Sequence, residues 1–199
     1  MRTLKEKFLI LRKLKYGEAD LILHALSPQG AKYSFIARSA LKSKKRFGGG
    51  ILEPSHFLVL TFKENSEVGG LHVLEEASLI NDFKGIRQSY DHLELSLHVL
   101  ECISKVAQEG DFTSEHLFNL TGNMLKAIEK SQSLHLLRLH FHLKFLLQQG
   151  VIQPEPWMSV FLKTPLSQSE EIKTSGSEIL EHSDSIEAMV RHYIQNASI

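Results

Sequence analysis

The first eighty residues alternate between apolar and polar side chains with a period of two, which is typical of β-strands. In the segment after Pro54, for example, His56, Leu58, Leu60 and Phe62 point one way and their neighbours point the other. Turn residues separate five such runs, and we expect strands at 8 to about 15, 20–26, 31 to about 37, 55–63 and 71 to about 80. This pattern predicts a small antiparallel barrel or sandwich.

Several of these runs are apolar on both faces, which suits a closed barrel that is packed inside and partly covered outside. An oligonucleotide-binding (OB) barrel is one such structure. It has five strands, and it binds single strands across strands two and three and their adjoining loops.

From about residue 85 the apolar residues follow the 3.6-residue period of amphipathic helices. The first helix should end at Gly110, and the residues with helical spacing that should face a core are Tyr90, Leu93, Leu97, Leu100, Ile103 and Ala107. A second should run from a cap within 111–114 to about 130, and a third from Ser131 or Ser133 to Gln149. The third is apolar on nearly all sides, which places it in the middle of a bundle.

The order weakens beyond Pro156. We expect a short apolar turn or helix at 157–162, mostly loop at 164–183, and a last helix capped by Ser183 or Asp184. The fold class is therefore α+β. A five-stranded OB barrel (1–80) is expected to bind nucleic acid, and an α-helical domain (81–199) is expected to bind partners.

Composition adds a contrast between the two halves. Residues 1–80 hold 13 Lys or Arg and 8 Asp or Glu, a net charge of +5, whereas residues 81–199 hold 10 and 15, a net charge of −5. The chain contains one cysteine, Cys102, so no intrachain disulfide forms, and a cytoplasmic location is the simplest expectation. We expect no signal peptide and no membrane span, because every apolar run is short.

The segment from Lys32 to Arg46 carries six cations and no acid. Such a loop repels itself unless an anion neutralises it, and a polyphosphate backbone is the usual anion of that shape. Aromatic residues on the preceding strand, Tyr33 and Phe35, either stack on bases or fill the barrel. The candidate nucleic-acid-binding residues are Lys32, Tyr33, Arg38, Lys42, Lys44, Lys45 and Arg46. The alternative for the loop is a solvated basic surface.

No catalytic or metal-binding motif is evident. Gly48–Gly50 is not followed by Lys-Ser or Lys-Thr, so it is no phosphate-binding P-loop, and no nucleophile elbow occurs. His135, His140 and His142 are spaced by five and two, whereas a helical metal pair needs three or four. We expect no enzyme activity, no cofactor and no metal.

Several segments together resemble the bacterial recombination mediator family RecO. They are Tyr16-Gly17-Glu18-Ala19-Asp20-Leu21-Ile22-Leu23, Gly30-Ala31-Lys32, Ala37-Arg38, Lys44-Lys45-Arg46-Phe47-Gly48-Gly49, Leu52-Glu53-Pro54, and Phe145-Leu146-Leu147 with Gly150 and Pro154 beyond. The resemblance implies a cytoplasmic, nucleoid-associated DNA repair protein with an OB barrel and a helical domain. Such a protein binds single- and double-stranded DNA and anneals complementary strands. With RecR it loads RecA on strands coated by single-stranded-DNA-binding protein (SSB).

The resemblance also implies that the helical domain binds the acidic, apolar-ended C-terminal tail of SSB. The tail requires an apolar groove with cations at its rim, and the candidates are Lys126, Lys130, Arg138 and Lys144. The chain departs from the family in two ways. Many members carry a four-cysteine zinc element where this chain has 154–159, which contain no cysteine, so zinc is not expected. The expected basic closing segment is also missing, which puts RecR cooperation in question.

Two other functions fit the pattern. A barrel with a basic loop does not distinguish DNA from RNA, so an RNA-binding OB protein is one alternative. The other is a protein-interaction module in which the acidic helical half is the functional part and the basic loop is incidental.

Overall fold

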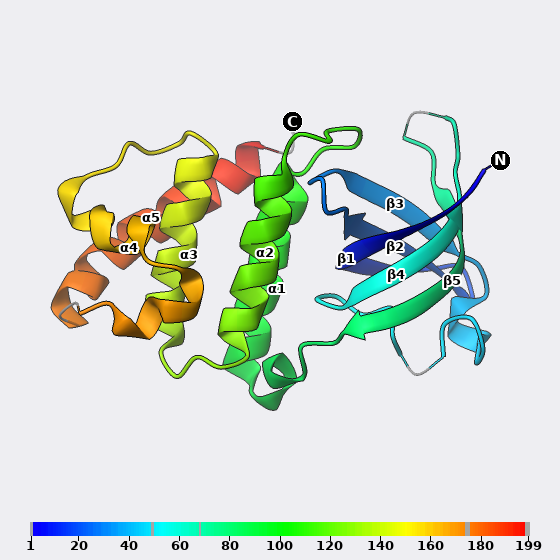
Figure 1. Ribbon diagram of the computed structural model, residues 1–199, viewed down its shortest axis with the longest axis horizontal. Coiled ribbons are helices and arrows are strands. Elements are labelled where there is room, and N and C mark those ends of the chain that lie inside the picture. The colour runs from blue at the N-terminus through cyan, green and yellow to red at the C-terminus, as the bar shows by residue number, and fades with distance from the viewer. Residues whose placement is uncertain (1, 49, 68, 174–175, 198–199) are drawn as a thin grey trace. The chain divides into compact units, whose positions relative to one another are not determined.

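The computed structural model describes residues 2–48, 50–67, 69–173 and 176–197, and its first half is a closed five-stranded barrel (Figure 1). The strands are β1 (Thr3–Tyr16), β2 (Asp20–Leu26), β3 (Lys32–Ala37), β4 (Phe57–Lys63) and β5 (His72–Asn81). They follow one another around the barrel in the order β1-β2-β3-β5-β4. All pairs are antiparallel except β3 with β5, which run parallel. The expected barrel is confirmed.

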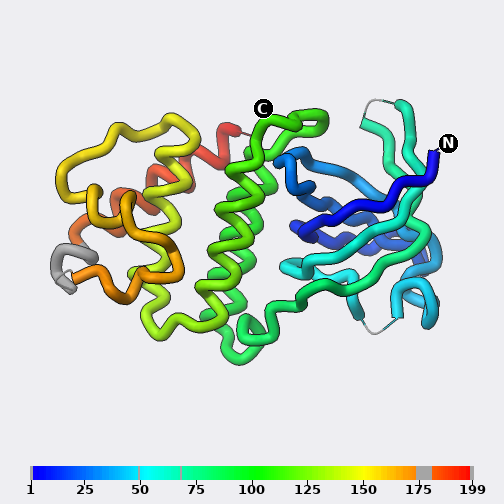
Figure 2. Tube along the Cα trace, in the orientation of Figure 1, coloured from blue at the N-terminus to red at the C-terminus, as the bar shows by residue number. Residues whose placement is uncertain are grey.

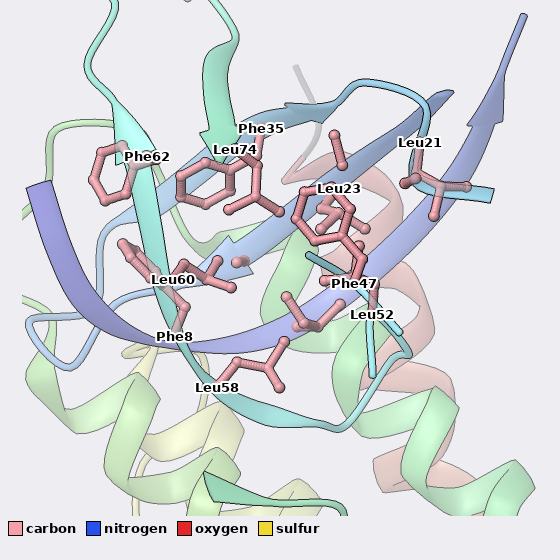
Figure 3. Close-up of a cluster of buried hydrophobic side chains, with 14 residues drawn as sticks. Phe8, Leu21, Leu23, Phe35, Phe47, Leu52, Leu58, Leu60, Phe62 and Leu74 are labelled. Atoms are coloured by element: carbon pink, nitrogen blue, oxygen red, sulfur yellow. The ribbon is translucent and has the colours of Figure 1, made fainter. Parts of the chain in front are cut away.

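The alternation within each strand sets the barrel core. Leu58, Leu60 and Phe62 of β4 are fully buried, whereas the residues between them are partly exposed. Phe35 fills the interior, where its ring lies 5.1 Å from those of Phe8 and Phe62. Figure 3 shows this cluster, which residues from outside the strands also join.

Those additional residues come from the basic loop, residues 38–54 with Gly49 outside the described residues. Ala40, Phe47 and Leu52 are buried in the barrel core, and Figure 3 shows Phe47 and Leu52 among the strand side chains. A short 3-10 turn, η1 (Ala40–Lys42), begins the loop. Three buried apolar anchors therefore hold the loop against the barrel.

Residues 107–119 pack with the barrel, although they follow the first helix in sequence. The backbone amide of Lys32 donates to the carbonyl of Gln108 at 2.9 Å, and the Ser34 hydroxyl donates to Glu109 at 2.9 Å. A Cβ on Gly30 would overlap the backbone of Ser114, so only glycine allows this approach.

The remaining elements are helical. They are η2 (Lys84–Gln88), α1 (Tyr90–Val106), α2 (Glu115–Ile128), α3 (Leu134–Gln148), η3 (Pro156–Met158), α4 (Ser159–Lys163), η4 (Leu166–Glu171) and α5 (Gly176–Asn196). The helix α3 contacts α1, α4, η4 and α5 (Figure 2). Nine of its 15 residues are buried. The prediction that this helix lies in the middle of a bundle is confirmed. In the described part of the chain no helix has the length and apolar character needed to cross a membrane.

Two expectations for the helices were wrong. In the first half of α1, Tyr90, Leu93 and Leu97 are exposed, because the helix buries Leu95 and Val99 there; in its second half Leu100 and Ile103 are buried as expected. The last helix begins at Gly176, so part of the expected loop at 164–183 is helical, and Ser183 and Asp184 lie inside α5 instead of capping it. Polar residues at 181–185 hid the continuity of this helix.

The structure contains two compact units. One holds the residues up to Phe83 together with Ala107–Asn119, and the other holds Lys84–Val106 and the residues from Leu120 onward. We therefore propose two domains that divide at about residue 80, with the segment Ala107–Asn119 added to the barrel domain.

Candidate nucleic-acid interface

Five of the predicted cations lie together on the basic loop. Arg38, Lys42, Lys44, Lys45 and Arg46 are all exposed. Among the ion pairs of the described residues, none joins one of these five cations to an acid. Their mutual repulsion is therefore not relieved within the described part of the chain, which favours an external anion.

Hydrogen bonds to the β1–β2 turn fix the start of the loop. The amide of Ser39 donates to the Asp20 carboxylate at 2.7 Å, and the amide of Leu41 donates to the Ala19 carbonyl at 3.0 Å. Ser39 adopts a positive φ of 54°, a backbone conformation that few residues other than glycine adopt. The cations thus project from a folded segment and not from a free chain.

The second turn of the loop, residues 44–48, is also fixed by close contacts. A Cβ on Gly48 would overlap the carbonyl oxygen of Lys44, so the turn over 44–48 closes only with glycine. The Arg46 guanidinium lies 5.0 Å from the ring centre of Phe47 and donates to the Arg38 carbonyl at 2.9 Å. Arg46 therefore both supports the loop and presents charge.

The structure places the other two candidates, Lys32 and Tyr33, at the opposite end of β3. Lys32 pairs with Leu26, whereas Ala37 pairs with Leu21 beside the loop. At about 3.3 Å per residue, Lys32 and Arg38 are ~20 Å apart along the strand. The seven predicted residues therefore fall into two groups.

The ring of Tyr33 belongs to the aromatic end of the barrel core. It lies 5.0 Å from Phe8 and 5.4 Å from His72, and it is half-buried. Burial, with nearby Glu6 and Glu64, raises the pKa of its hydroxyl. Carboxylates beside Tyr33 oppose phosphate binding, so this end is the less suitable for a nucleic acid.

Sequence reasoning did not select Tyr16, an exposed aromatic beside the loop. It ends β1 and is 55% exposed. Its turn, 17–19, accepts the hydrogen bond from Leu41. The signal was an aromatic residue directly before a turn glycine, Gly17, at the end of an apolar strand.

A second group of predicted cations lines a pocket in the helical unit. Lys126 and Lys130 lie at a pocket of about 420 Å³, with apolar walls from Ala127, Leu137 and Leu166. Glu170 reaches the same place and covers the start of α3, because it accepts from the amides of Gln132 at 2.5 Å and Ser133 at 3.2 Å. The hollow therefore combines apolar walls with two lysines and the carboxylates of Glu170 and Glu171.

The other two helical candidates lie elsewhere. Arg138 forms an ion pair with Glu94, and Lys144 donates to the Leu162 carbonyl at 2.9 Å. Burial lowers the pKa of Lys144. Neither residue lines the pocket, so the structure brings together only Lys126 and Lys130 of the four.

Reactive groups in the helical unit are buried. Burial raises the pKa of the Cys102 thiol to about 12, so it is not a thiolate at neutral pH. His98 and His142 face each other with 2.8 Å between their Nε2 atoms. In the described residues no group of three or more His, Cys, Asp or Glu side chains has an arrangement that could hold a metal ion.

Comparison with known proteins matches both parts of the chain. The model of the family "Recombination protein O N terminal" matches residues 1–83. The chain is 31% identical over 144 residues to DNA repair protein RecO of Desulfosudis oleivorans, which covers 72% of this chain and 55% of that protein. It is 31% identical over 148 residues to the protein of the same name in Maridesulfovibrio salexigens, covering 74% and 58%. The chain thus spans a little over half the length of these relatives.

Proposed function

This chain belongs to the RecO family, and from that premise we propose that it is a DNA-binding recombination mediator in DNA repair. It binds single- and double-stranded DNA and anneals complementary strands. With RecR it loads RecA on SSB-coated single strands in the cytoplasm. The partners RecR and RecA rest on the family resemblance alone.

One observation carries the DNA-binding part of this proposal: five exposed cations project from a loop that its own contacts hold in place. Phosphate contacts by Lys and Arg supply most of the sequence-independent affinity of such proteins. A loop that is already ordered loses little conformational entropy on binding, so more of the electrostatic gain remains as affinity.

The proposed action is binding and not catalysis. The thiol of Cys102 is buried and protonated, which removes the one cysteine as a nucleophile. Annealing needs only a surface that neutralises two phosphate backbones while bases pair.

The test is fluorescence anisotropy of a labelled single strand with a triple charge reversal, Lys44→Glu, Lys45→Glu and Arg46→Glu. We expect at least a tenfold loss of affinity, because three phosphate contacts become repulsive. The matched control reverses three exposed lysines of the helical unit, Lys105, Lys163 and Lys173. Equal losses in the two variants would contradict the proposed interface.

An RNA-binding OB protein remains the second candidate function, because phosphate contacts alone do not separate DNA from RNA. Competition between DNA and RNA oligomers of matched sequence decides between them. The DNA assignment expects DNA to compete at least as well as RNA, and a strong preference for RNA would reverse it.

We propose further that the pocket beside Lys126 and Lys130 binds the SSB tail. Its apolar walls suit the tail's apolar end, and Lys126 and Lys130 attract its acidic residues, against the opposing charge of Glu170 and Glu171 in the same lining. Reversing both lysines to Glu should weaken binding of a labelled tail peptide at least fivefold and leave DNA affinity unchanged. The control reverses Lys105 and Lys173. If reversing Lys126 and Lys130 left the peptide affinity unchanged, this pocket would not be the binding site.

A further inference from the structure

A hollow of about 310 Å³ lies between the basic loop and the rim of the barrel. Its apolar walls come from Leu21, Leu41, Phe47 and Leu52. Phe47 and Leu52 are buried anchors, so the walls on that side are rigid. A volume of this size is at the lower end of the usual range for small-molecule sites, which combine apolar walls with a few polar groups.

The hollow also contains polar groups of both kinds. Lys13 and Glu53 line it and form a half-buried ion pair, in which both carboxylate oxygens lie 2.6 Å from Nζ. The hydroxyl of Ser43 lines it as well and accepts from the Arg46 amide at 3.2 Å, which leaves its own proton to donate. The hollow can therefore donate to and accept from the edge of a heterocyclic ring.

Leu41 is the exposed wall of this hollow. It is 53% exposed, on a loop that otherwise presents cations to solvent. The hydrogen bond from its amide to Ala19 and the 3-10 turn around it fix the backbone from which this side chain projects. A large apolar side chain in this place offers a surface for a ring that enters from solvent.

The rim of the hollow is positively charged, which favours phosphate. Lys44 lines the hollow, and Lys42 and Lys45 are its exposed neighbours in the loop. One sugar joins a base to its phosphate, so a strand held by these cations brings a base to the hollow.

We propose that this hollow takes one unstacked base of a single strand while the loop cations hold the adjacent phosphates. This inference rests on the proposed DNA-binding function and adds to it a base-binding subsite. A base in a duplex is paired and stacked, so it does not reach the hollow. The subsite therefore favours single over double strands.

The test uses Leu41→Ser, which removes the exposed wall without changing charge. A base that covers Leu41 removes apolar surface from water, so we expect a loss of about fivefold in single-strand affinity when that surface is removed. Duplex affinity should stay within about twofold. The control is Leu97→Ser, which removes a similarly exposed leucine, 46% against 53%, from α1.

The second readout is the emission of 2-aminopurine placed within the single strand. Wild type should raise this emission on binding, because the base leaves its stack, and Leu41→Ser should lose the rise. Glu53→Gln, which keeps the size of the side chain, should reduce it as well. An unchanged rise in both variants, or equal losses on single and double strands, would overturn the subsite. If the triple reversal at 44–46 also had no effect, the proposed function itself would fail.

Discussion

Gly48 is the residue on which the shape of the basic loop depends. Its Cα lies against the Lys44 carbonyl, where no Cβ fits. Phe47, directly before it, is 4% exposed in the barrel core. The glycine therefore joins a buried anchor to a turn that aims Lys44 and Lys45 outward.

Replacing Gly48 by Ala should open this turn. We expect the free energy of unfolding to fall by about 1–3 kcal/mol, because either the turn or the Phe47 anchor must shift. Single-strand affinity should fall with it. Urea unfolding and anisotropy measure the two effects.

The control for this change is Gly122→Ala. Gly122 lies in α2 with open space around its Cα, so the alanine should stabilise the helix by about 0.5–1 kcal/mol. A Gly48→Ala protein as stable and as active in binding as wild type would show that the close approach has no consequence.

Residue roles were the hardest part to predict. The charge run from Lys32 to Arg46 indicated a binding segment, but it could not show that β3 separates Lys32 from the loop. Tyr33 and Phe35 share one face of the strand. The local pattern could not show that acids from other strands, such as Glu6, lie near Tyr33.

At the scale of elements, α3 is a helix of buried imidazoles. His140 donates from Nε2 to the Thr164 carbonyl at 3.0 Å and accepts at Nδ1 from Ser169 at 2.5 Å, so it ties η4 to the helix. Burial, with nearby Lys144, lowers its pKa to about 4. Burial, with His98 and Arg138, lowers the pKa of His142 to about 3.

These lowered values predict a loss of stability in mild acid. The unfolded chain takes up protons below pH ~6.5, whereas folded His140 and His142 stay neutral down to about pH 4 and 3. Each of these two histidines should therefore lower the free energy of unfolding by about 1.4 kcal/mol for each pH unit below the unfolded-state pKa of ~6.5.

Urea unfolding at pH 7 and pH 5 measures this effect. The slope of stability against pH gives the number of protons taken up on unfolding. His140→Gln should reduce that number by about one, whereas replacing the exposed His135 by Gln should leave it unchanged. If His140→Gln kept the full dependence of wild type, the imidazole would not be neutral in the fold.

Elements were more predictable than sites because their periods are local. Alternation at Leu58, Leu60 and Phe62 gave β4, and all-round apolarity gave the central place of α3. The buried face of α1 was predicted correctly at Leu100 and Ile103 but not in the first half of the helix, where Tyr90, Leu93 and Leu97 follow helical spacing as well as Leu95 and Val99 do. Only tertiary packing decides between two apolar faces of one helix.

At the scale of the whole molecule, charge is divided along the chain, +5 in residues 1–80 and −5 in residues 81–199. A polyanion is attracted to the first part and repelled by the second. Binding to DNA should therefore depend on few, localised contacts, in a chain that spans a little over half the length of its relatives.

The salt dependence of single-strand binding measures those contacts most directly. Each phosphate contact contributes about −0.7 to the slope of log affinity against log salt, so neutralising Lys44, Lys45 and Arg46 to Gln should make the slope shallower by about 2. The same change at Lys105, Lys163 and Lys173 should leave it unaltered. A slope that is equal in wild type and in the loop variant would contradict the account, because the loop would then touch no phosphate.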